Sequence, residues 1–304
     1  MSFSLSFAQV TRAAPWPARY GHACVAWQGR LWLLGGTETC DEGRQLRDVW
    51  SSSDGLHWEC MTEHASWPPR WAHAVFACGD RLVLIGGLDS VNPIHNLADI
   101  WTTCDGANWT QASAPAPWLP RHVWATAVAP EALWIIGGAT SGQLYHNDVW
   151  RSDDGCAWRE TDVVGPRFSP RKNHAAAVLG DGVYVLGGSV LDASAPHGAR
   201  YVNDVWRSAD GAAWDLVCER APWRPRCFHH LLSWSDSLWL SGGNFGGADY
   251  SDAIWRSPDG ANWDLISHFP WPRRHAETMT LWRGRVWVMG GTSTSHGTTA
   301  HNDI

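Results

Sequence analysis

An arginine recurs six times along the chain, and its type and spacing point to chemistry more directly than any other residue. Each arginine stands sixteen residues before the first glycine of a Gly-Gly pair, and this spacing never varies. Guanidinium groups bind carboxylates and phosphates in a bidentate geometry, so six of them at one end of a fold would attract an anionic ligand. In the alternative, each arginine pairs with an aspartate of its own repeat (Asp48, Asp99, Asp148, Asp204, Asp303) or with loop carbonyls. The six arginines are Arg19, Arg70, Arg121, Arg171, Arg226 and Arg274.

A second column follows three residues after each arginine. Four histidines at matching positions could form a metal site. The alternative is structural, with the histidines hydrogen-bonded between neighbouring repeats, and we favour it. We therefore expect no metal ion and no cofactor. The column reads His22, His73, Trp124, His174, His229 and Glu277.

The third and sixth repeats depart from this column in the same way. Both lose the usual histidine and gain one directly after the arginine, at His122 and His275. Together with Trp124 and Glu277, these residues predict an asymmetric pocket, in which the aromatic ring stacks on a ligand and the titratable groups orient it or transfer protons. An internal duplication, or chance, would explain the same coincidence without a function.

The elements that position these residues are short strands. The arginine-to-arginine periods are 51, 51, 50, 55 and 48 residues. Each repeat contains an apolar run, a second run ending in Gly-Gly and a third segment typified by Asp48-Val49-Trp50, and the first five repeats continue to a final strand. An Asp-Gly pair before the final strand predicts a type I′ hairpin turn, in which both central residues have positive φ. Nineteen of the 24 tryptophans fall in four columns, which indicates a structural core.

The motifs Pro-Arg-x-x-His-Ala, Gly-Gly and Asn-Asp-Val-Trp resemble the kelch repeat. This resemblance implies an all-β fold, a six-bladed kelch-type β-propeller with four antiparallel strands per blade. Phe7 aligns with Trp109 of the second repeat, and the chain ends at Ile304 inside a third strand. We therefore expect residues 3–10 to complete the last blade and close the propeller.

The arginines also set the expected boundaries of a single domain, residues 1–304. Residues 1–18 hold the closing strand and the lead-in to the first blade. The six blades are expected at residues 19–69, 70–120, 121–170, 171–225, 226–273 and 274–304.

Charge and composition exclude several classes of protein. The net charge of −7 argues against binding to nucleic acid, which needs clustered basic residues. No apolar run is long enough to cross a membrane, and the N-terminus carries no basic and apolar leader, so we expect a soluble cytoplasmic protein. The eight cysteines include no CxxC pair, and we expect them to be reduced.

For function, the sequence favours a non-catalytic binding module that recognises a small acidic ligand or a peptide or protein partner. The expected site is the arginine-lined mouth of the channel, which includes Lys172, the only lysine of the chain. The longest segment after a Gly-Gly pair, residues 189–203, adds Asp192, His197, Arg200 and Tyr201 as rim candidates. The alternative is an enzyme such as an isomerase, mutarotase or epimerase acting on a small polar substrate, with Glu277, His275 and His122 as candidate catalytic residues.

Overall fold

The computed structural model describes residues 5–38, 43–89, 95–140, 144–195, 198–247, 249–293 and 299–304. In these ranges the regular structure is entirely β, and the fold class is that of a six-bladed kelch-type β-propeller, as the repeats predict. The chain divides into two compact units. The terminal unit comprises Ala8–His122 and Ala276–Ile304, and the middle unit comprises Met1–Phe7 and Val123–His275.

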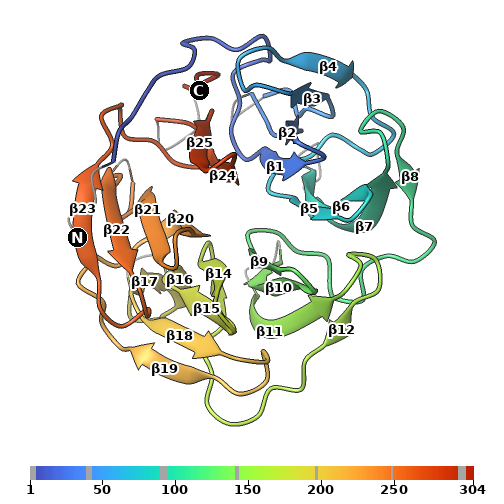
Figure 1. The fold of residues 1–304 in the computed structure, drawn as a ribbon. Helices are drawn as coiled ribbons and strands as arrows, with labels where there is room; N and C mark the ends of the chain where they lie inside the picture. The colour runs from blue at the N-terminus through green and yellow to red at the C-terminus, as the bar shows by residue number, and fades with distance from the viewer. Residues whose placement is uncertain are drawn as a thin grey trace. The chain divides into compact units, whose positions relative to one another are not determined.

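The terminal unit contains the first two blades and the strands of the sixth. Blades one and two are four-stranded and antiparallel, and each follows the chain order of its strands (Figure 1). Blade six contributes a two-stranded hairpin. The strands are β1 (Ala23–Trp27), β2 (Arg30–Leu34), β3 (Val49–Ser52) and β4 (Glu59–Thr62); β5 (Ala74–Cys78), β6 (Arg81–Asp89), β7 (His95–Thr103) and β8 (Thr110–Gln111); β24 (Thr278–Trp282) and β25 (Arg285–Met289).

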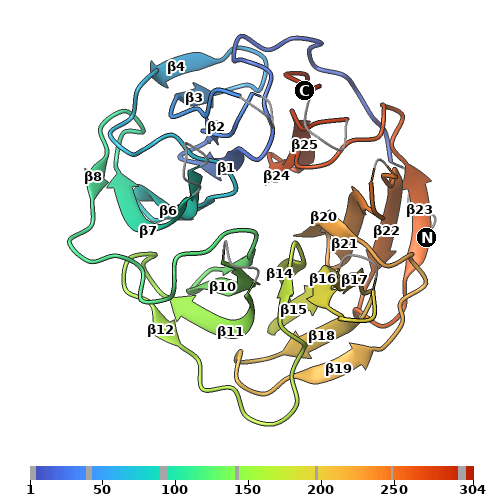
Figure 2. The same cartoon turned by 180° about the vertical axis from the view of Figure 1, so that it is seen from behind.

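The middle unit contains blades three, four and five, each again a four-stranded antiparallel sheet (Figure 2). A small additional sheet, in the order β13-β16-β17, combines residues just before the first strand of blade four with the segment between its second and third strands. The strands are β9 (Ala125–Ala129), β10 (Ala132–Ala139), β11 (Tyr145–Ser152) and β12 (Arg159–Glu160); β13 (Arg171–Lys172), β14 (Ala175–Leu179), β15 (Gly182–Leu186), β16 (Ser189–Leu191), β17 (Ala199–Tyr201), β18 (Val205–Ser208) and β19 (Asp215–Cys218); β20 (Cys227–Ser233), β21 (Leu238–Asn244), β22 (Ala253–Ser257) and β23 (Asp264–His268).

Tryptophan fills the space between neighbouring blades, as its columns predict. The tryptophan three residues before the arginine packs edge to face on the last tryptophan of the repeat that this arginine begins, as in Trp16 with Trp58 and Trp67 with Trp109. Trp16 and Trp67 are fully buried. Such aromatic pairs contribute roughly 0.5–1.5 kcal/mol beyond the area that they bury.

The Asp-Gly turn differs from the predicted type I′ turn, because only its glycine has positive φ. In the first blade the Asp54 carboxylate instead accepts hydrogen bonds from the N–H groups of Leu56 and His57, both at 2.8 Å. Glycine is needed for space as well as for conformation. A Cβ added to Gly106 would collide with the Trp32 ring of the preceding blade.

The N-terminal segment completes the last blade, as the sequence predicts. Phe7 packs edge to face on Trp271 at 5.7 Å, which is the role that Trp58 and Trp109 have in their own blades. In the terminal unit the Val10 N–H donates to the Ile304 carbonyl at 2.8 Å. The described part, from residue 5 onward, does this without forming a regular strand, and residues 3 and 4 lie outside the described ranges.

Candidate functional site

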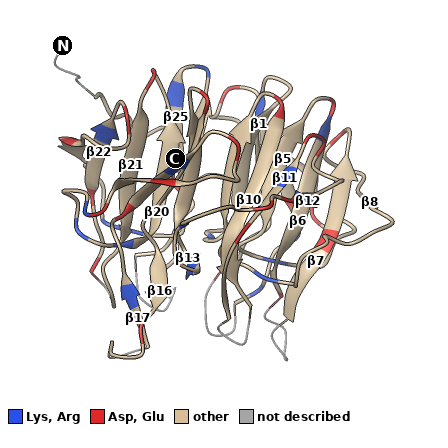
Figure 3. Cartoon of the chain, turned by 90° about the horizontal axis from the view of Figure 1, so that it is seen from below, with Lys and Arg blue, Asp and Glu red and all other residues tan. Residues whose placement is uncertain are grey.

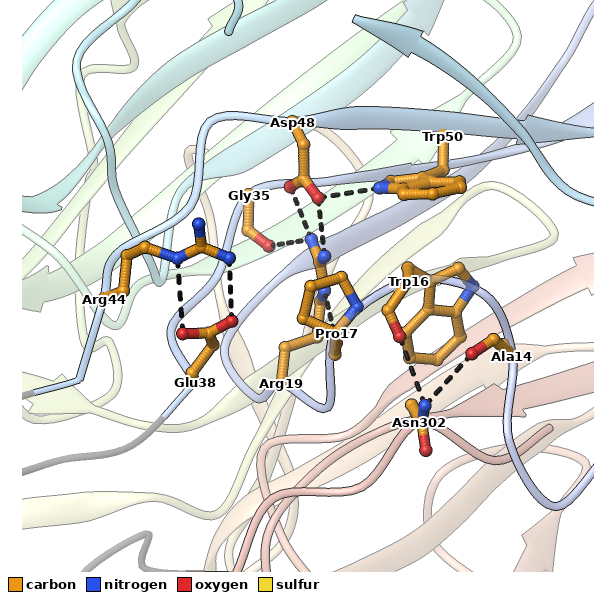
Figure 4. A network of polar contacts seen from close by, with 10 residues as sticks. All are labelled: Ala14, Trp16, Pro17, Arg19, Gly35, Glu38, Arg44, Asp48, Trp50 and Asn302. Carbon is orange, nitrogen blue, oxygen red and sulfur yellow. Dashed lines mark hydrogen bonds and ion pairs between the residues drawn. The ribbon is translucent and has the colours of Figure 1, made fainter. Parts of the chain in front are cut away.

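In three blades the recurring arginine forms a buried ion pair with the aspartate of its own blade. In blade one, Arg19 Nη1 and Nη2 each donate at 2.7 Å to one oxygen of the Asp48 carboxylate (Figure 4). Nη1 also donates to the Gly35 carbonyl and Nε to the Pro17 carbonyl. Trp50 Nε1 donates to the same Asp48 oxygen as Nη2. Arg19 is fully buried, so its donors are occupied inside the blade.

The same arrangement recurs in two other blades, as Arg70 with Asp99 and as Arg171 with Asp204. The pairing that the sequence offered as the alternative to ligand binding is therefore observed for three of the six arginines. Arg121 and Arg274 are also buried, and each donates from Nε to the carbonyl two residues earlier. A ligand-binding role for this column stays a prediction.

The column histidines lie under the Gly-Gly pair of the preceding blade. His73 Cε1 would contact a Cβ added to Gly35, and His229 Cε1 would contact one added to Gly187. Burial and then the nearby arginine lower the pKa of His73 and of His229 to about 3, and they hold the pKa of His174 well below its usual range. These three imidazoles are neutral and buried, so they serve as packing groups.

Each residue of the predicted pocket between blades three and six is described by its own contacts. His122 shares a 2.8 Å hydrogen bond with the Asn96 side chain, and Glu277 is buried against the Gly291 backbone. His275 stacks on the Tyr250 ring with centroids 4.9 Å apart. His122 and Glu277 belong to the terminal unit, and Trp124 and His275 belong to the middle unit. Their common pocket stays a prediction.

The structure instead draws attention to a basic and aromatic surface in the middle unit, which we call the rim: Lys172, Arg200, Tyr201, Arg224 and Phe245, with the buried ring of Tyr145 against Lys172. The long segment after Gly187-Gly188 forms the β16–β17 hairpin, which pairs with β13 and lies at the lower edge of Figure 3. Lys172 is paired with Ser189 and Ser189 with Tyr201, so the three form one row across the sheet. Residues in such a row lie close together on one face.

Lys172 lies at the centre of the rim. Its ammonium group is 4.8 Å from the centroid of the Tyr145 ring, at the start of a blade-three strand. Tyr201 shares a hydrogen bond with the Cys227 thiol, on the first strand of blade five. Burial raises the pKa of Tyr201 and the pKa of Cys227 to about 12, so both stay protonated at neutral pH. The ends of three blades therefore meet around one lysine.

The rim continues along blade five, where Arg224 Cζ lies 4.3 Å from the Phe245 ring centroid. Arg226 Cζ lies 4.9 Å from the same centroid, but Arg226 is buried and is not part of the rim. Arg224 is exposed and pairs with Asp249 at 2.7 Å. Arg200 on the hairpin pairs with Asp192 at 3.2 Å. In contrast, Lys172 contacts no carboxylate in the described part of the chain.

The sequence identified part of this surface. Lys172, Arg200 and Tyr201 are candidates from the sequence that lie on the rim, whereas His197 falls outside the described residues. A role of these residues in binding stays a prediction. Tyr145, Arg224 and Phe245 were not expected. Phe245 is the second residue after the pair Gly242-Gly243. Its position at the start of a segment that follows Gly-Gly could have identified it as a rim candidate.

Three further observations concern metal ligands, cysteines and membrane-spanning helices in the described ranges. No three His, Cys, Asp or Glu side chains come close enough there to hold a metal ion. The seven cysteines of these ranges form no disulfide with one another. These ranges contain no helix with the length and hydrophobicity needed to span a membrane.

Comparison with known proteins identifies the repeats. Residues 72–291 match the model of the KLHDC2/KLHL20/DRC7 Kelch-repeats domain, which is more than two thirds of the chain. The chain is 30% identical over 179 residues to the flagellar outer arm dynein alpha chain of Chlamydomonas reinhardtii, an alignment covering 54% of this chain and 4% of that protein. It is 27% identical over 172 residues to acyl-CoA-binding domain-containing protein 5 of Arabidopsis thaliana, covering 55% and 26% of the two.

A third relative is the Rab9 effector protein with kelch motifs of Bos taurus. It is 27% identical over 171 residues, covering 54% of this chain and 44% of the relative. The matched region is thus less than half the length of each of these three relatives.

Proposed function

Because the chain belongs to the kelch-repeat family, we propose that it is a binding module whose rim recognises an acidic peptide segment of a protein partner. The observation that carries this proposal is Lys172. It is held over the Tyr145 ring, in the same cross-strand row as Tyr201 with Ser189 between them, without a carboxylate partner in the described ranges. In a chain with net charge −7, an unpaired cation at the junction of three blades is a suitable receptor for an anion.

The composition of the rim fits recognition of a peptide. Tyrosine and phenylalanine offer large, rigid contact areas at a low entropic cost, and arginine is common at energetically important positions of interfaces. Arg200 and Arg224 are paired with Asp192 and Asp249 in the free protein, and these exposed pairs contribute little stability. An incoming carboxylate could exchange with either aspartate at low cost.

One of the matched relatives is named as an effector of Rab9, which fits a protein partner for a kelch chain. No observation favours the enzyme alternative to the same degree. The column histidines whose pKa is strongly lowered are neutral, and the Cys227 thiol is protonated, so neither supplies a nucleophile or a base near neutral pH. A cytoplasmic location, expected from the sequence, is part of the proposal.

The test uses fluorescently labelled synthetic peptides rich in Asp and Glu, and matched peptides in which Asn and Gln replace every acidic residue. Fluorescence anisotropy should show binding of the acidic set alone, with an affinity that falls as salt is raised. Lys172→Glu and Arg200→Glu should each weaken binding at least tenfold, which corresponds to about 1.4 kcal/mol.

The control variant is Arg159→Glu on β12. Arg159 is exposed, and its partner Asp153 keeps a second arginine, Arg151, at 3.6 Å. This change alters the net charge by the same amount and should leave peptide binding unchanged. Equal binding of the acidic and amide peptides, or equal losses in Arg159→Glu and Lys172→Glu, would refute the rim as the site.

A further inference from the structure

Blade five lacks the carboxylate that holds the arginine in the blades described above. At the position of Asp48, Asp99 and Asp204 it has Ala253. The backbone is nevertheless in the same register, because the Ser251 N–H donates to the Gly243 carbonyl as Leu46 N–H donates to Gly36 in blade one. Ala253 therefore occupies the aspartate position without the aspartate carboxylate.

The donors that meet this carboxylate in other blades are still present in blade five. In blades one, two and four, one aspartate oxygen, Oδ2, accepts hydrogen bonds from both the arginine Nη2 and a tryptophan Nε1, all at 2.6–2.8 Å. The corresponding groups are Arg226 Nη2 and Trp255 Nε1. Trp255 Nε1 is buried without a partner among the described residues. Arg226 Nη2 likewise donates to none of them.

Ser251 replaces only part of the missing group. Its hydroxyl oxygen accepts a hydrogen bond from Arg226 Nη1 at 2.9 Å, where Asp Oδ1 accepts in the other blades. It also accepts from the Ala253 N–H. Its own proton has no acceptor in the described part of the chain. Three donors in the same position of the blade, from Arg226, Ser251 and Trp255, thus lack an acceptor.

The charge around these donors is positive. Arg226 is 2% exposed, and burial together with the charge of Arg224 lowers its pKa to about 10, so it remains a cation at neutral pH. The nearest acidic residues in the sequence are engaged elsewhere. Asp249 pairs with Arg224, and Asp252 pairs with His268 and Arg273. A buried cation without a counterion is unfavourable, so this position favours an anion.

We propose that blade five binds a small carboxylate at Arg226, Ser251 and Trp255, in place of the missing aspartate side chain. Asp differs from Ala by one carboxylate group on Cβ, so a formate ion supplies the missing atoms. A planar carboxylate also matches the fork of the guanidinium group. The site is separate from the proposed peptide function, since the rim could bind a peptide with or without a carboxylate inside blade five.

The probe is sodium formate, compared with sodium chloride and sodium sulfate at matched ionic strength, and thermal unfolding is the measurement. A ligand that binds only the folded protein raises Tm. For a chain of this length, formate at ten times its Kd should raise Tm by about 2 °C. Chloride should not reproduce the rise, because it lacks the size and planar shape of the missing group. Sulfate stabilises folded proteins in general by exclusion from their surface, so any rise that it causes should persist in Ala253→Asp, unlike the rise caused by formate.

Three variants make the test specific. Ala253→Asp supplies the carboxylate covalently and should raise Tm in chloride and abolish the response to formate. Trp255→Phe removes one donor with little change of shape and should reduce the response, which keeps the test informative if Ala253→Asp does not fold. Asp204→Ala creates the same gap in blade four and should be destabilised and then rescued by formate.

The results separate the proposal from its competitors. A formate response in Asp204→Ala but not in the wild-type protein would show that the assay detects such a site and that water fills blade five, which overturns the proposal. Equal stabilisation by all three salts, or a formate response that persists in Ala253→Asp and Trp255→Phe, would also overturn it. Loss of peptide binding in Lys172→Glu has no bearing on these outcomes.

Discussion

Removal of Asp99 should destabilise the protein far more than removal of an exposed ion pair of equal length. Asp99 accepts hydrogen bonds from Arg70 Nη1 and Nη2 at 2.7 Å and from Trp101 Nε1 at 2.6 Å. Arg70 is fully buried. Asp99→Ala leaves an uncompensated buried charge, which typically costs about 3–5 kcal/mol. With an unfolding entropy of about 2.1 cal/mol/K per residue, this loss lowers Tm by roughly 5–8 °C.

The comparison is Glu59→Ala. Glu59 accepts a hydrogen bond from Arg30 at 2.6 Å, but its side chain is 69% exposed. Exposed pairs contribute about 0–1 kcal/mol, so this variant should unfold within a degree or two of the wild-type protein. Both changes are measured by calorimetry and by urea denaturation at pH 7.

A double-mutant cycle isolates the pair itself. Arg70→Met combined with Asp99→Ala removes the buried charge together with its partner. Its loss of stability should be smaller than the sum of the two single losses by about 2 kcal/mol. The buried pair of Arg70 and Asp99 would not stabilise the blade if Asp99→Ala were no more destabilising than Glu59→Ala. The same conclusion would follow if the effects of Arg70→Met and Asp99→Ala were additive.

Three further predictions follow from other features. Acidification from pH 7 to pH 5 should destabilise the protein, because His73 has a pKa of about 3 when folded and about 6.5 when unfolded. The contribution of neutral His73 to the free energy of unfolding is complete above the unfolded pKa and is lost as the pH falls below it. In His73→Gln, denaturation curves should show this pH-dependent loss reduced by ~2 kcal/mol, and an unchanged slope would show that His73 is not buried in its neutral form. Gly106→Ala should lower stability by about 1–3 kcal/mol, because the added Cβ collides with Trp32. Gly79 also has positive φ but has no atom within 4 Å of an added Cβ, so Gly79→Ala should cost less stability, and equal losses in the two variants would argue against the collision. Val10→Pro removes the N–H that donates to the Ile304 carbonyl and should lower Tm. The control is Ala8→Pro, because the Ala8 N–H donates to no described residue, and equal Tm values for the two variants would place the closure of blade six elsewhere.

The sequence by itself determined the number of blades, the strand order and the closure of blade six. These properties follow from spacing along the chain, because every repeat places the same residue types at the same offsets and an equivalent backbone puts them in equivalent contacts. The role of Phe7 could be predicted for this reason. Its place in the repeat matches that of Trp109, and it packs on Trp271 as Trp109 packs on Trp67. The pairing of Arg19 with Asp48 was likewise available as one of two alternatives.

Tertiary structure decided which polar groups are occupied and which residues meet. Sequence offsets show that Ala253 replaces an aspartate. Only the folded blade shows that Ser251 compensates one donor of Arg226 and that Trp255 Nε1 has no partner among the described residues. Likewise, Tyr145, Lys172 and Tyr201 belong to three separate strands, and their contact depends on how neighbouring strands pack. The repeat pattern sets what equivalent positions share, whereas hydrogen-bond satisfaction depends on the distances between particular atoms.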